Sequence, residues 1–320
     1  MAKSVTLKKT VALLAVALFF SAIDLGIFTL YTAKCIPDTS PEMQAKSITL
    51  EEYLPFAENS KFVKRKGSLT LEGKLPVLDS AAALYPVSSA FVHALYPENS
   101  APFNGADFAA DSALRMNNTR NAYKAIVDGD TDIALLAKPS AEQLAYATEK
   151  GVELELTPVG CEAFVFLVHR DNPVDGLTVE QIKDIYTGKN TNWRDFGGKN
   201  KAIIPLQRNE GSGSQTAFLS FMDGEEAVRR SADPFGSCIG FSFRFYVEGV
   251  VQNGNVKMLS LNGVYPDREN ISNKKYPIVS NFYAVHRKGD ENPNVQKVID
   301  WVLSDEGQSI IDDSGYVRLA

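Results

Sequence analysis

The sequence predicts an α/β protein whose folded region follows an N-terminal hydrophobic segment. After Lys74, short apolar stretches of strand length alternate with amphipathic stretches of helical length, which is typical of βαβ units and of sheets with a large parallel component. The chain has 320 residues, of which 44% are hydrophobic and 22% charged, so it can bury a sizeable core in one or two domains. The first 34 residues stand apart because a long apolar run occupies most of them.

Residues 1–34 have the pattern of a signal peptide or a membrane anchor. Three lysines precede an apolar run, Val11–Tyr31, that is long enough to span the ~30 Å hydrocarbon core of a bilayer. Asp24 interrupts this run at a cost of about 3 kcal/mol on insertion scales, which favours a signal peptide with Val11–Phe20 as its core. An uncleaved anchor is the alternative. In both cases we expect the rest of the chain outside the cytoplasm and attached to the cell membrane, in a periplasm or on the cell surface.

The segment 35–74 is predicted to be a polar tether. It has a basic cluster near its middle and no sustained period, with room for one short helix. Cys35 lies where a lipid-modified cysteine would follow an export signal, but Lys34 occupies the preceding position, where lipoprotein signals have a small residue. Lipidation at Cys35 therefore stays open.

Capping and turn residues mark where the helices and strands beyond the tether begin and end. Thr178 and Gln181 have the spacing of a capping box ahead of an apolar helical face, and Gly188 is placed as the stop of that helix. The other expected elements are, in chain order, strand Leu75–Leu78, helix Ala83–Leu95, helix Arg120–Val127, strands Asp132–Leu136, Glu153–Pro158, Phe164–Val168 and Ile203–Leu206, helix Gln215–Met222, strand Tyr283–His286, and helices Val295–Leu303 and Asp305–Ile311.

From Ile203 onward the sequence has the order strand, arginine, Gly/Ser loop and helix. This order suits an anion-binding site. The first amides of a helix have no intrahelical acceptor and lie at the positive end of its dipole. Arg208 supplies a charged fork for two oxygens, and Ser212 and Ser214 add hydroxyl donors. By itself such a loop is also compatible with an ordinary turn and helix cap.

The sequence around this loop contains a series of motifs in a fixed order. They are Glu162–Val168, Asn172–Val174, Leu177–Ile182, Asp184–Gly188, Thr191–Trp193, Gln207–Arg208, Gly211–Thr216, Ile239–Phe241, Leu259–Val264, Trp301–Ser304, Glu306–Gln308 and Gly315–Val317. In this order they resemble the phosphate-binding proteins of ABC phosphate transporters, which belong to the type II periplasmic-binding-protein superfamily. The resemblance covers about Leu75 to Leu319.

The resemblance implies a two-lobed clamp in which each lobe is a mixed sheet flanked by helices. Lobe one would comprise residues 75–160 and 265–320, lobe two would comprise residues 161–264, and crossing strands would form the hinge. It also implies a monomer that captures phosphate or a similar inorganic oxyanion by hinge closure for the membrane subunits of an ABC permease, without catalysis and without a cofactor. The family's ligand contacts carry over to Arg208, Ser212, Gly213 and Ser214.

The chain departs from the family ahead of its first helix. Where the family has a glycine- and hydroxyl-rich turn, this sequence has three alanines, Ala81–Ala83. The amides of Ala82 and Ala83 can still point at an anion, but their side chains cannot donate. Asn117, Asn118 and Thr119, ahead of the helix Arg120–Val127, are candidates for substitute donors on lobe one, and ordinary helix capping explains them equally well.

A second departure affects the choice of ligand. In the family a carboxylate follows the strand that matches Asp132–Leu136, accepts the proton of the ligand and separates phosphate from fully ionised sulfate; here Ala137 occupies that position. Asp79 is the obvious candidate to have taken over the role. Without a replacement, discrimination against sulfate should be poor. The departures also leave an alternative function, a membrane-tethered sensor or adhesion module that keeps the fold but has lost tight phosphate binding.

Other classes of function find little support. A net charge of -6 leaves no broad basic surface for a nucleic acid. Gly236–Gly240 has the shape of a nucleophile elbow with a cysteine, but no histidine lies in a partner motif, and the three histidines are too scattered to predict a metal site. Cys161 and Cys238 match no metal-ligand spacing; a bridge between them or two free thiols both stay open.

Overall fold

The computed structural model describes residue 43 and the ranges 48–229 and 237–319. The predicted signal or anchor segment 1–34 and Cys35 lie outside the described residues. Within the described ranges, no helix has both the length and the apolar character that a membrane crossing needs.

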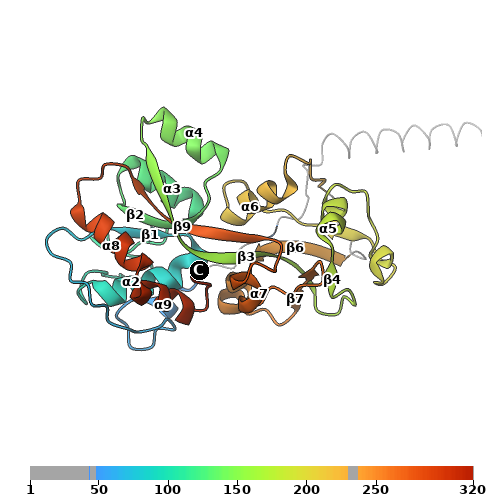
Figure 1. Ribbon diagram of the computed structural model, residues 1–320, viewed down its shortest axis with the longest axis horizontal. Helices are drawn as coiled ribbons and strands as arrows, with labels where there is room; N and C mark the ends of the chain where they lie inside the picture. Colours follow the sequence, from blue (N-terminus) through green and yellow to red (C-terminus); the bar gives the residue numbers. More distant parts are fainter. Residues whose placement is uncertain (1–42, 44–47, 230–236, 320) are drawn as a thin grey trace, which may run out of the picture. The chain divides into compact units, whose positions relative to one another are not determined.

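A mixed sheet runs through the whole unit formed by residues 42–320 (Figure 1). Strands β1 and β2 are parallel, as are β5 and β6, and the other neighbours are antiparallel. The order across the sheet is β1 (Leu78–Ser80), β2 (Ile133–Ala137), β9 (Val279–Arg287), β3 (Leu154–His169), β6 (Ser237–Phe243) and β5 (Ile203–Pro205). Strand β7 (Val256–Met258) also pairs with β3, and β4 (Gly176–Leu177) pairs separately with β8 (Ser260–Leu261).

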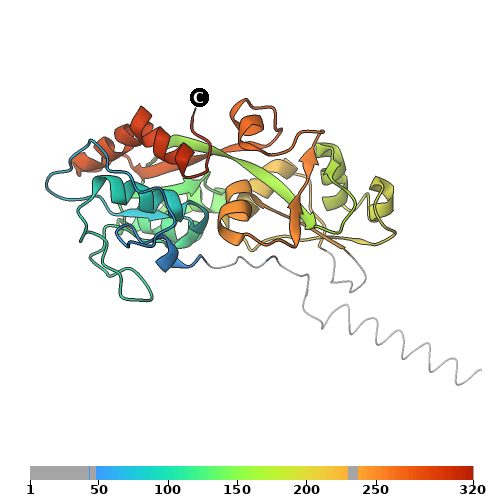
Figure 2. The same ribbon diagram turned by 90° about the horizontal axis from the view of Figure 1, so that it is seen from below.

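Strand β3 crosses from one half of the sheet to the other (Figure 2). Its first part, 154–163, pairs with β9, and its last part, 164–168, pairs with β6. The sequence predicted two separate strands here. They are one strand because Pro158 and Gly160 bend the ladder at a bulge instead of ending it. Glycine is needed at this bend, since a Cβ at Gly160 would lie 2.3 Å from the ring of Phe282.

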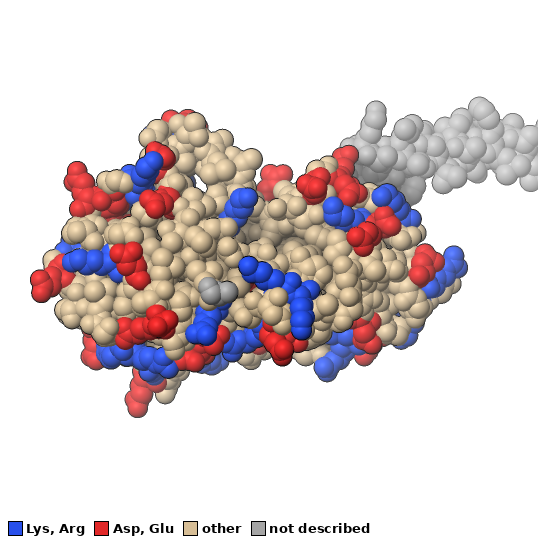
Figure 3. Space-filling view, in the orientation of Figure 1, with Lys and Arg blue, Asp and Glu red and all other residues tan. Residues whose placement is uncertain are grey.

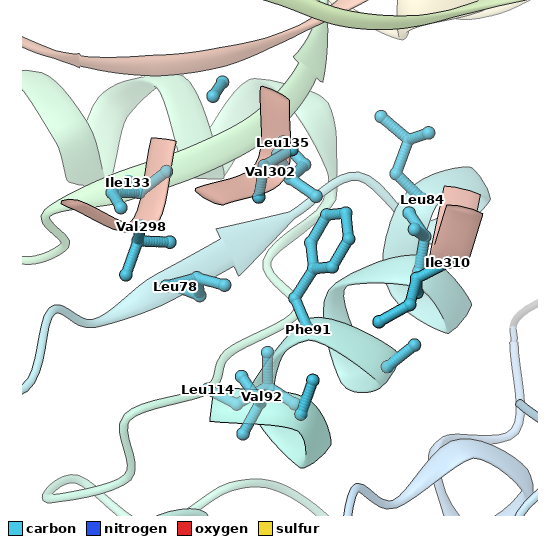
Figure 4. Packing of buried hydrophobic residues seen from close by; sticks show 14 of the residues in the cluster. Leu78, Leu84, Phe91, Val92, Leu114, Ile133, Leu135, Val298, Val302 and Ile310 are labelled. Carbon is cyan, nitrogen blue, oxygen red and sulfur yellow. The ribbon is translucent and has the colours of Figure 1, made fainter. Parts of the chain in front are cut away.

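Lobe one is built around β1 and β2 (Figures 1 and 4). On one face Phe91 and Val92 of α2 pack with Ile133 and Leu135 of β2, while α3 packs against the alternate residues of that strand on the other face. This two-sided burial explains why the strand is apolar throughout. The helices are α2 (Tyr85–Leu95), α3 (Asn118–Asp128), α4 (Ala141–Glu149), α8 (Pro293–Leu303) and α9 (Asp305–Asp313).

Lobe two packs around the far end of β3 with β5, β6 and β7. Its core is aromatic: the rings of Phe218 and Phe241 stack with centroids 4.5 Å apart. The predicted capping box of Thr178 and Gln181 is present, and Gly188 follows the helix with a φ of 79°. The helices are α5 (Val179–Tyr186), α6 (Gly213–Met222) and α7 (Arg268–Ser272), with η3 (Trp193–Phe196) and η4 (Tyr246–Val251) as further short helical segments.

Two of the predicted segment boundaries differ from the structure. Residues 48–74 were expected within a tether, yet Ile48, Tyr53 and Phe62 are buried in the core of lobe one, and η1 (Leu50–Tyr53) packs against α2. These apolar residues are isolated in an irregular segment, so no helical or strand periodicity in the sequence indicates that they are buried. Residues 265–278 were assigned to lobe one, but Ile271 belongs to the core of lobe two. The chain therefore returns to lobe one along β9, later than expected.

Candidate functional site

A cavity of about 610 Å³ lies between the lobes, beside the crossing strands. Lobe one lines it with residues 81–84, 118–121 and 137, and lobe two lines it with residues 208–214. Strands β3, β6 and β9 contribute further lining residues, among them Glu162, Ser242 and Asn281. All seven residues predicted to contact a ligand line this one cavity: Arg208, Ser212, Gly213, Ser214, Thr119, Ala82 and Ala83.

Arg208 enters the cavity from the loop between β5 and α6. Its backbone N–H donates to the side-chain oxygen of Gln215 at 2.9 Å, which fixes the loop to the first turn of α6. Its Nε atom is buried and has no hydrogen-bond partner among the described residues. Burial lowers the pKa of the guanidinium, and nearby Tyr246 opposes this effect; an arginine nevertheless keeps its charge at neutral pH. A half-buried cation of this kind is suited to an anionic ligand.

The N-terminus of α6 supplies the second group of donors. Ser212 is the N-cap residue, and its hydroxyl oxygen accepts from the amide of Gln215 at 3.2 Å. A hydroxyl that accepts in this way still has its own proton to donate to a ligand. The amides of Gly213 and Ser214 lie in the first helical turn, where no intrahelical acceptor exists and the helix dipole favours negative charge.

Lobe one meets this helix terminus from the opposite side. A Cβ added at Gly213 would lie 3.2 Å from the hydroxyl oxygen of Thr119 and 3.4 Å from the Cβ of Ala137. Arg120 donates to the backbone oxygen of Glu210. The two lobes therefore touch at residues that line the cavity.

The alternative role of Thr119 as a helix cap is not what the structure shows. Asn117 is the N-cap residue of α3 and makes no capping bond through its side chain, while the side chain of Asn118 accepts from the amide of Asn121 at 3.2 Å. The side chain of Thr119 is instead buried at the contact between the lobes.

Ala82 and Ala83 begin a short helical segment, η2 (Ala82–Leu84), that leads directly into α2. Both residues line the cavity and are partly buried. Their amides occupy the first turn of this helical stretch, where the backbone donors lack intrahelical acceptors. The backbone oxygen of Ala83 accepts from the hydroxyl of Tyr316 at 2.7 Å, which holds the turn in place.

Asp79 is not the replacement for the missing carboxylate. Its side chain is fully buried and accepts from the amide of Ser80 at 2.7 Å, from the amide of Asn117 at 3.0 Å and from the side chain of Asn117 at 2.8 Å. Burial raises the pKa of Asp79, and the bonds from Asn117 and Ser80 oppose this effect. Asp79 does not line the cavity, so it positions the start of α3 instead, and Ala137 faces the cavity without an acceptor side chain.

A buried ion pair that includes the lining residue Glu162 was not predicted as part of the site. The Oε1 atom of Glu162 on β3 accepts from Nε of Arg244 at 3.1 Å, and its Oε2 atom accepts from the amide of Phe245 at 2.9 Å. Arg244 also donates to Glu248 and to the backbone oxygen of Gly315, each at 2.6 Å. The pair links the crossing strand to the end of β6 and to the C-terminal segment. The sequence shows two charged residues but gives no signal of their pairing.

The remaining candidate signals do not form sites. Cys161 and Cys238 are free thiols. Cys238 lies within strand β6 and pairs with Ile204, so it does not occupy the strand-to-helix turn of a nucleophile elbow. Among the described residues, no cluster of three or more His, Cys, Asp or Glu side chains could hold a metal ion. Figure 3 shows acidic and basic residues interspersed on one face, without an extended basic area.

Comparison with known proteins matches the chain to a family model and to phosphate-binding proteins. A family model described as PBP superfamily domain matches residues 94–306. The phosphate-binding protein PstS of Bacillus subtilis (strain 168) is 24% identical over 267 residues, which cover 79% of this chain and 81% of that protein. PstS of Borreliella burgdorferi is 24% identical over 284 residues, covering 82% of this chain and 91% of that protein.

Solved structures show the same fold. A Clostridium perfringens structure, described as a phosphate ABC transporter substrate-binding protein with bound phosphate, has a TM-score of 0.58 and 24% identity and covers 76% of this chain and 99% of its own. An ABC-type phosphate transport receptor from Vibrio cholerae has a TM-score of 0.53 and 19% identity and covers 75% of this chain and 98% of its own. The predicted two-lobed α/β architecture is confirmed.

Proposed function

Because this chain belongs to the PBP superfamily, we propose that it is an extracytoplasmic solute-binding protein that captures phosphate or a related oxyanion between its two lobes. The observation that carries the proposal is the convergence of a half-buried Arg208 and the first turn of α6 on a cavity that both lobes line. Two of its relatives are named phosphate-binding proteins, which supports the choice of ligand.

The two lobes would hold the anion with different groups. From lobe two, Arg208 offers two parallel charge-assisted bonds, and Ser212, Gly213 and Ser214 offer amides and hydroxyls at the positive end of the α6 dipole. From lobe one, Thr119 and the amides at the start of η2 complete the coordination. A ligand bound by both lobes interacts with the closed form more strongly than with the open form, and this difference drives closure about the crossing strands.

Capture would serve import. The N-terminal segment, with its lysines before the apolar run, would place the lobes outside the cytoplasm, and the closed form would deliver the anion to the membrane subunits of an ABC permease. We propose binding without chemical conversion, in keeping with the relatives named as binding proteins.

Calorimetric titration of the full-length protein in detergent, with phosphate and with sulfate, tests the proposal. A transport component should bind one of them with a dissociation constant of about 1 μM or lower, equivalent to about −8 kcal/mol. An absence of binding to both anions and to organic phosphates would contradict the proposal and favour the alternative, a tethered sensor or adhesion module, which the alanines at positions 81–83 and 137 suggest.

A further inference from the structure

The cavity is larger than a bare tetrahedral oxyanion requires. The lobes already touch through Gly213 and Thr119 and through Arg120 and Glu210, yet about 610 Å³ remains between them. Five heavy atoms occupy roughly 100 Å³, a few times the ~30 Å³ share of a water molecule. The volume that remains lies within the range of about 300–1,000 Å³ that is typical of pockets for organic ligands.

The lining of the cavity is divided into two chemically different parts. Arg208 and the first turn of α6 form the anion pole, defined here as residues 208 and 212–214. The aromatic wall consists of Phe245, Phe282 and Tyr316, whose rings form a cluster: Phe245 and Tyr316 have centroids 4.0 Å apart, and Phe282 and Tyr316 have centroids 5.7 Å apart. Phe282 and Tyr316 are only 4% and 1% exposed, so they support Phe245, which supplies the accessible ring. Phe245 remains partly exposed although it lies between the lobes. Its ring therefore offers apolar surface to the cavity, which no inorganic anion can use.

The polar groups near the wall suit an organic ligand as well. Ser242 on β6 and Ser280 and Asn281 on β9 line the cavity beside the aromatic residues, and their side chains can bond to hydroxyl or carbonyl groups. Glu162 also lines it, but its two carboxylate oxygens already accept from Arg244 and from backbone amides.

The missing acceptor at position 137 points to the same class of ligand. Inorganic phosphate near neutral pH always carries at least one proton, as the monoprotonated or the diprotonated ion, and that proton needs an acceptor. A phosphomonoester has a second pKa near 6 and is mostly a dianion at pH 7, so it needs donors alone. The anion pole provides donors, and Ala137 provides no acceptor side chain.

We propose that the physiological ligand is an organic phosphate, with its phosphoryl group at the anion pole and its organic group against the aromatic wall. This inference rests on the proposed function, because it names the ligand class of the same site. The organic group is small and at least partly apolar, since Phe245 and the alanine turn 81–83 also line the cavity that would hold it.

Competition titrations on the full-length protein test this inference, with inorganic phosphate, methyl phosphate and phenyl phosphate as the probes. Phenyl phosphate should bind at least tenfold more tightly than inorganic phosphate, and methyl phosphate should lie between them. Ser280→Leu, which enlarges a side chain of the cavity lining away from the anion pole, and Phe245→Leu, which shortens the wall, should each weaken phenyl phosphate about tenfold. Both should leave the affinity for inorganic phosphate within about threefold, which also reports that the variants are folded.

The matched control is Leu144→Ala, an exposed position on α4 that does not line the cavity, which should change neither affinity. Tight binding of inorganic phosphate with rejection of both esters would overturn the inference and leave the proposed function standing. Binding of none of the three anions would reject the proposed function itself. Binding of phenyl phosphate that neither lining variant weakens would overturn the placement of the organic group.

Discussion

Arg208 is the residue on which the anion pole depends most. Its Nε is buried and lacks a hydrogen-bond partner among the described residues, while its backbone is tied to Gln215. Arg208→Ala should therefore weaken anion binding by about 3 kcal/mol or more, a hundredfold or greater rise in Kd, because the charge of the ligand would stay buried without its partner. Arg208→Lys should also bind poorly, since an ammonium cannot form two parallel bonds. Titration calorimetry measures both.

Thermal unfolding of the ligand-free Arg208→Ala protein should match that of the unsubstituted protein, since the buried Nε atom of Arg208 has no hydrogen-bond partner in the described part of the chain. Arg194→Ala, an exposed arginine of the same lobe, is the control and should leave binding unchanged. An unchanged affinity in Arg208→Ala would move the site elsewhere.

Ala137 leads to a prediction about the selectivity between phosphate and sulfate. Asp79 is occupied by Ser80 and Asn117 and does not line the cavity, so it has not replaced the missing carboxylate. Sulfate should compete with phosphate to within about two orders of magnitude, because one acceptor bond or its loss is worth roughly 1–3 kcal/mol. Ala137→Asp should weaken sulfate most, through repulsion between the carboxylate and the fully ionised anion. Competition of sulfate with labelled phosphate measures this selectivity. Phosphate binding that millimolar sulfate does not reduce would refute the prediction.

At the scale of single residues, the sequence could predict residues of both lobes that line the cavity, but it gave no indication that Glu162 and Phe245 line it as well. Arg208 and Ser212 belong to a local strand–loop–helix motif, and local order along the chain is what a sequence shows directly. Glu162 and Phe245 reach the cavity from distant segments that meet only in the folded protein. The occupation of Asp79 by Asn117 also depends on tertiary contacts, which is why the sequence left its role open.

The middle of β3 and the end of β6 are held together by the ion pair of Glu162 and Arg244, both nearly inaccessible to solvent. Arg244→Met should lower the free energy of unfolding by about 3–5 kcal/mol, because the carboxylate of Glu162 would stay buried without its counter-charge. Adding Glu162→Gln to this variant should restore part of the loss. Urea unfolding of the single and double variants measures the difference. A double variant that is as unstable as the sum of the single variants would exclude coupling between the two residues.

The contact of α6 with α3 predicts an effect on closure. A Cβ added at Gly213 would lie 3.2 Å from the hydroxyl oxygen of Thr119, so the branched side chain of Gly213→Val would push the lobes apart. Anion affinity should fall tenfold or more, while the free energy of unfolding should change by less than about 1 kcal/mol, because neither lobe core is disturbed. Gly213→Ala serves as the milder control. Equal affinity in the valine variant would show that the lobes need not meet here for binding.

At the scale of elements, regular periods were predicted well and irregular packing was not. The capping box at Thr178 and the helices α2, α3, α5, α6, α8 and α9 follow from local patterns, and the structure confirms them, whereas α4 and α7 were not predicted. Strand β3 continues through Pro158 because a bulge absorbs it, although proline and glycine usually end a strand. The segment 48–74 packs through isolated residues such as Tyr53 and Phe62, and isolated apolar residues in a polar segment do not indicate burial.

For the whole molecule, the two-lobed architecture could be predicted only from the family resemblance. Alternation of strands and helices indicates an α/β class, but it does not indicate that β3 and β9 cross between two cores. That arrangement pairs residues more than a hundred positions apart, such as Leu156 with Val285. Contacts at this separation leave no periodic trace in the sequence.

The central claim is that one anion lies between the lobes at Arg208 and the first turn of α6, and locating that anion tests it most directly. The described part of the chain offers a competing place, a cavity of about 580 Å³ on lobe two that is lined by His169, Lys199 and Lys201. Crystals grown with arsenate, a phosphate analogue, would locate the arsenic atom by anomalous scattering. The account predicts a single strong peak beside the Arg208 guanidinium and the amides of Gly213 and Ser214; a peak in the lobe-two cavity, with none between the lobes, would contradict it.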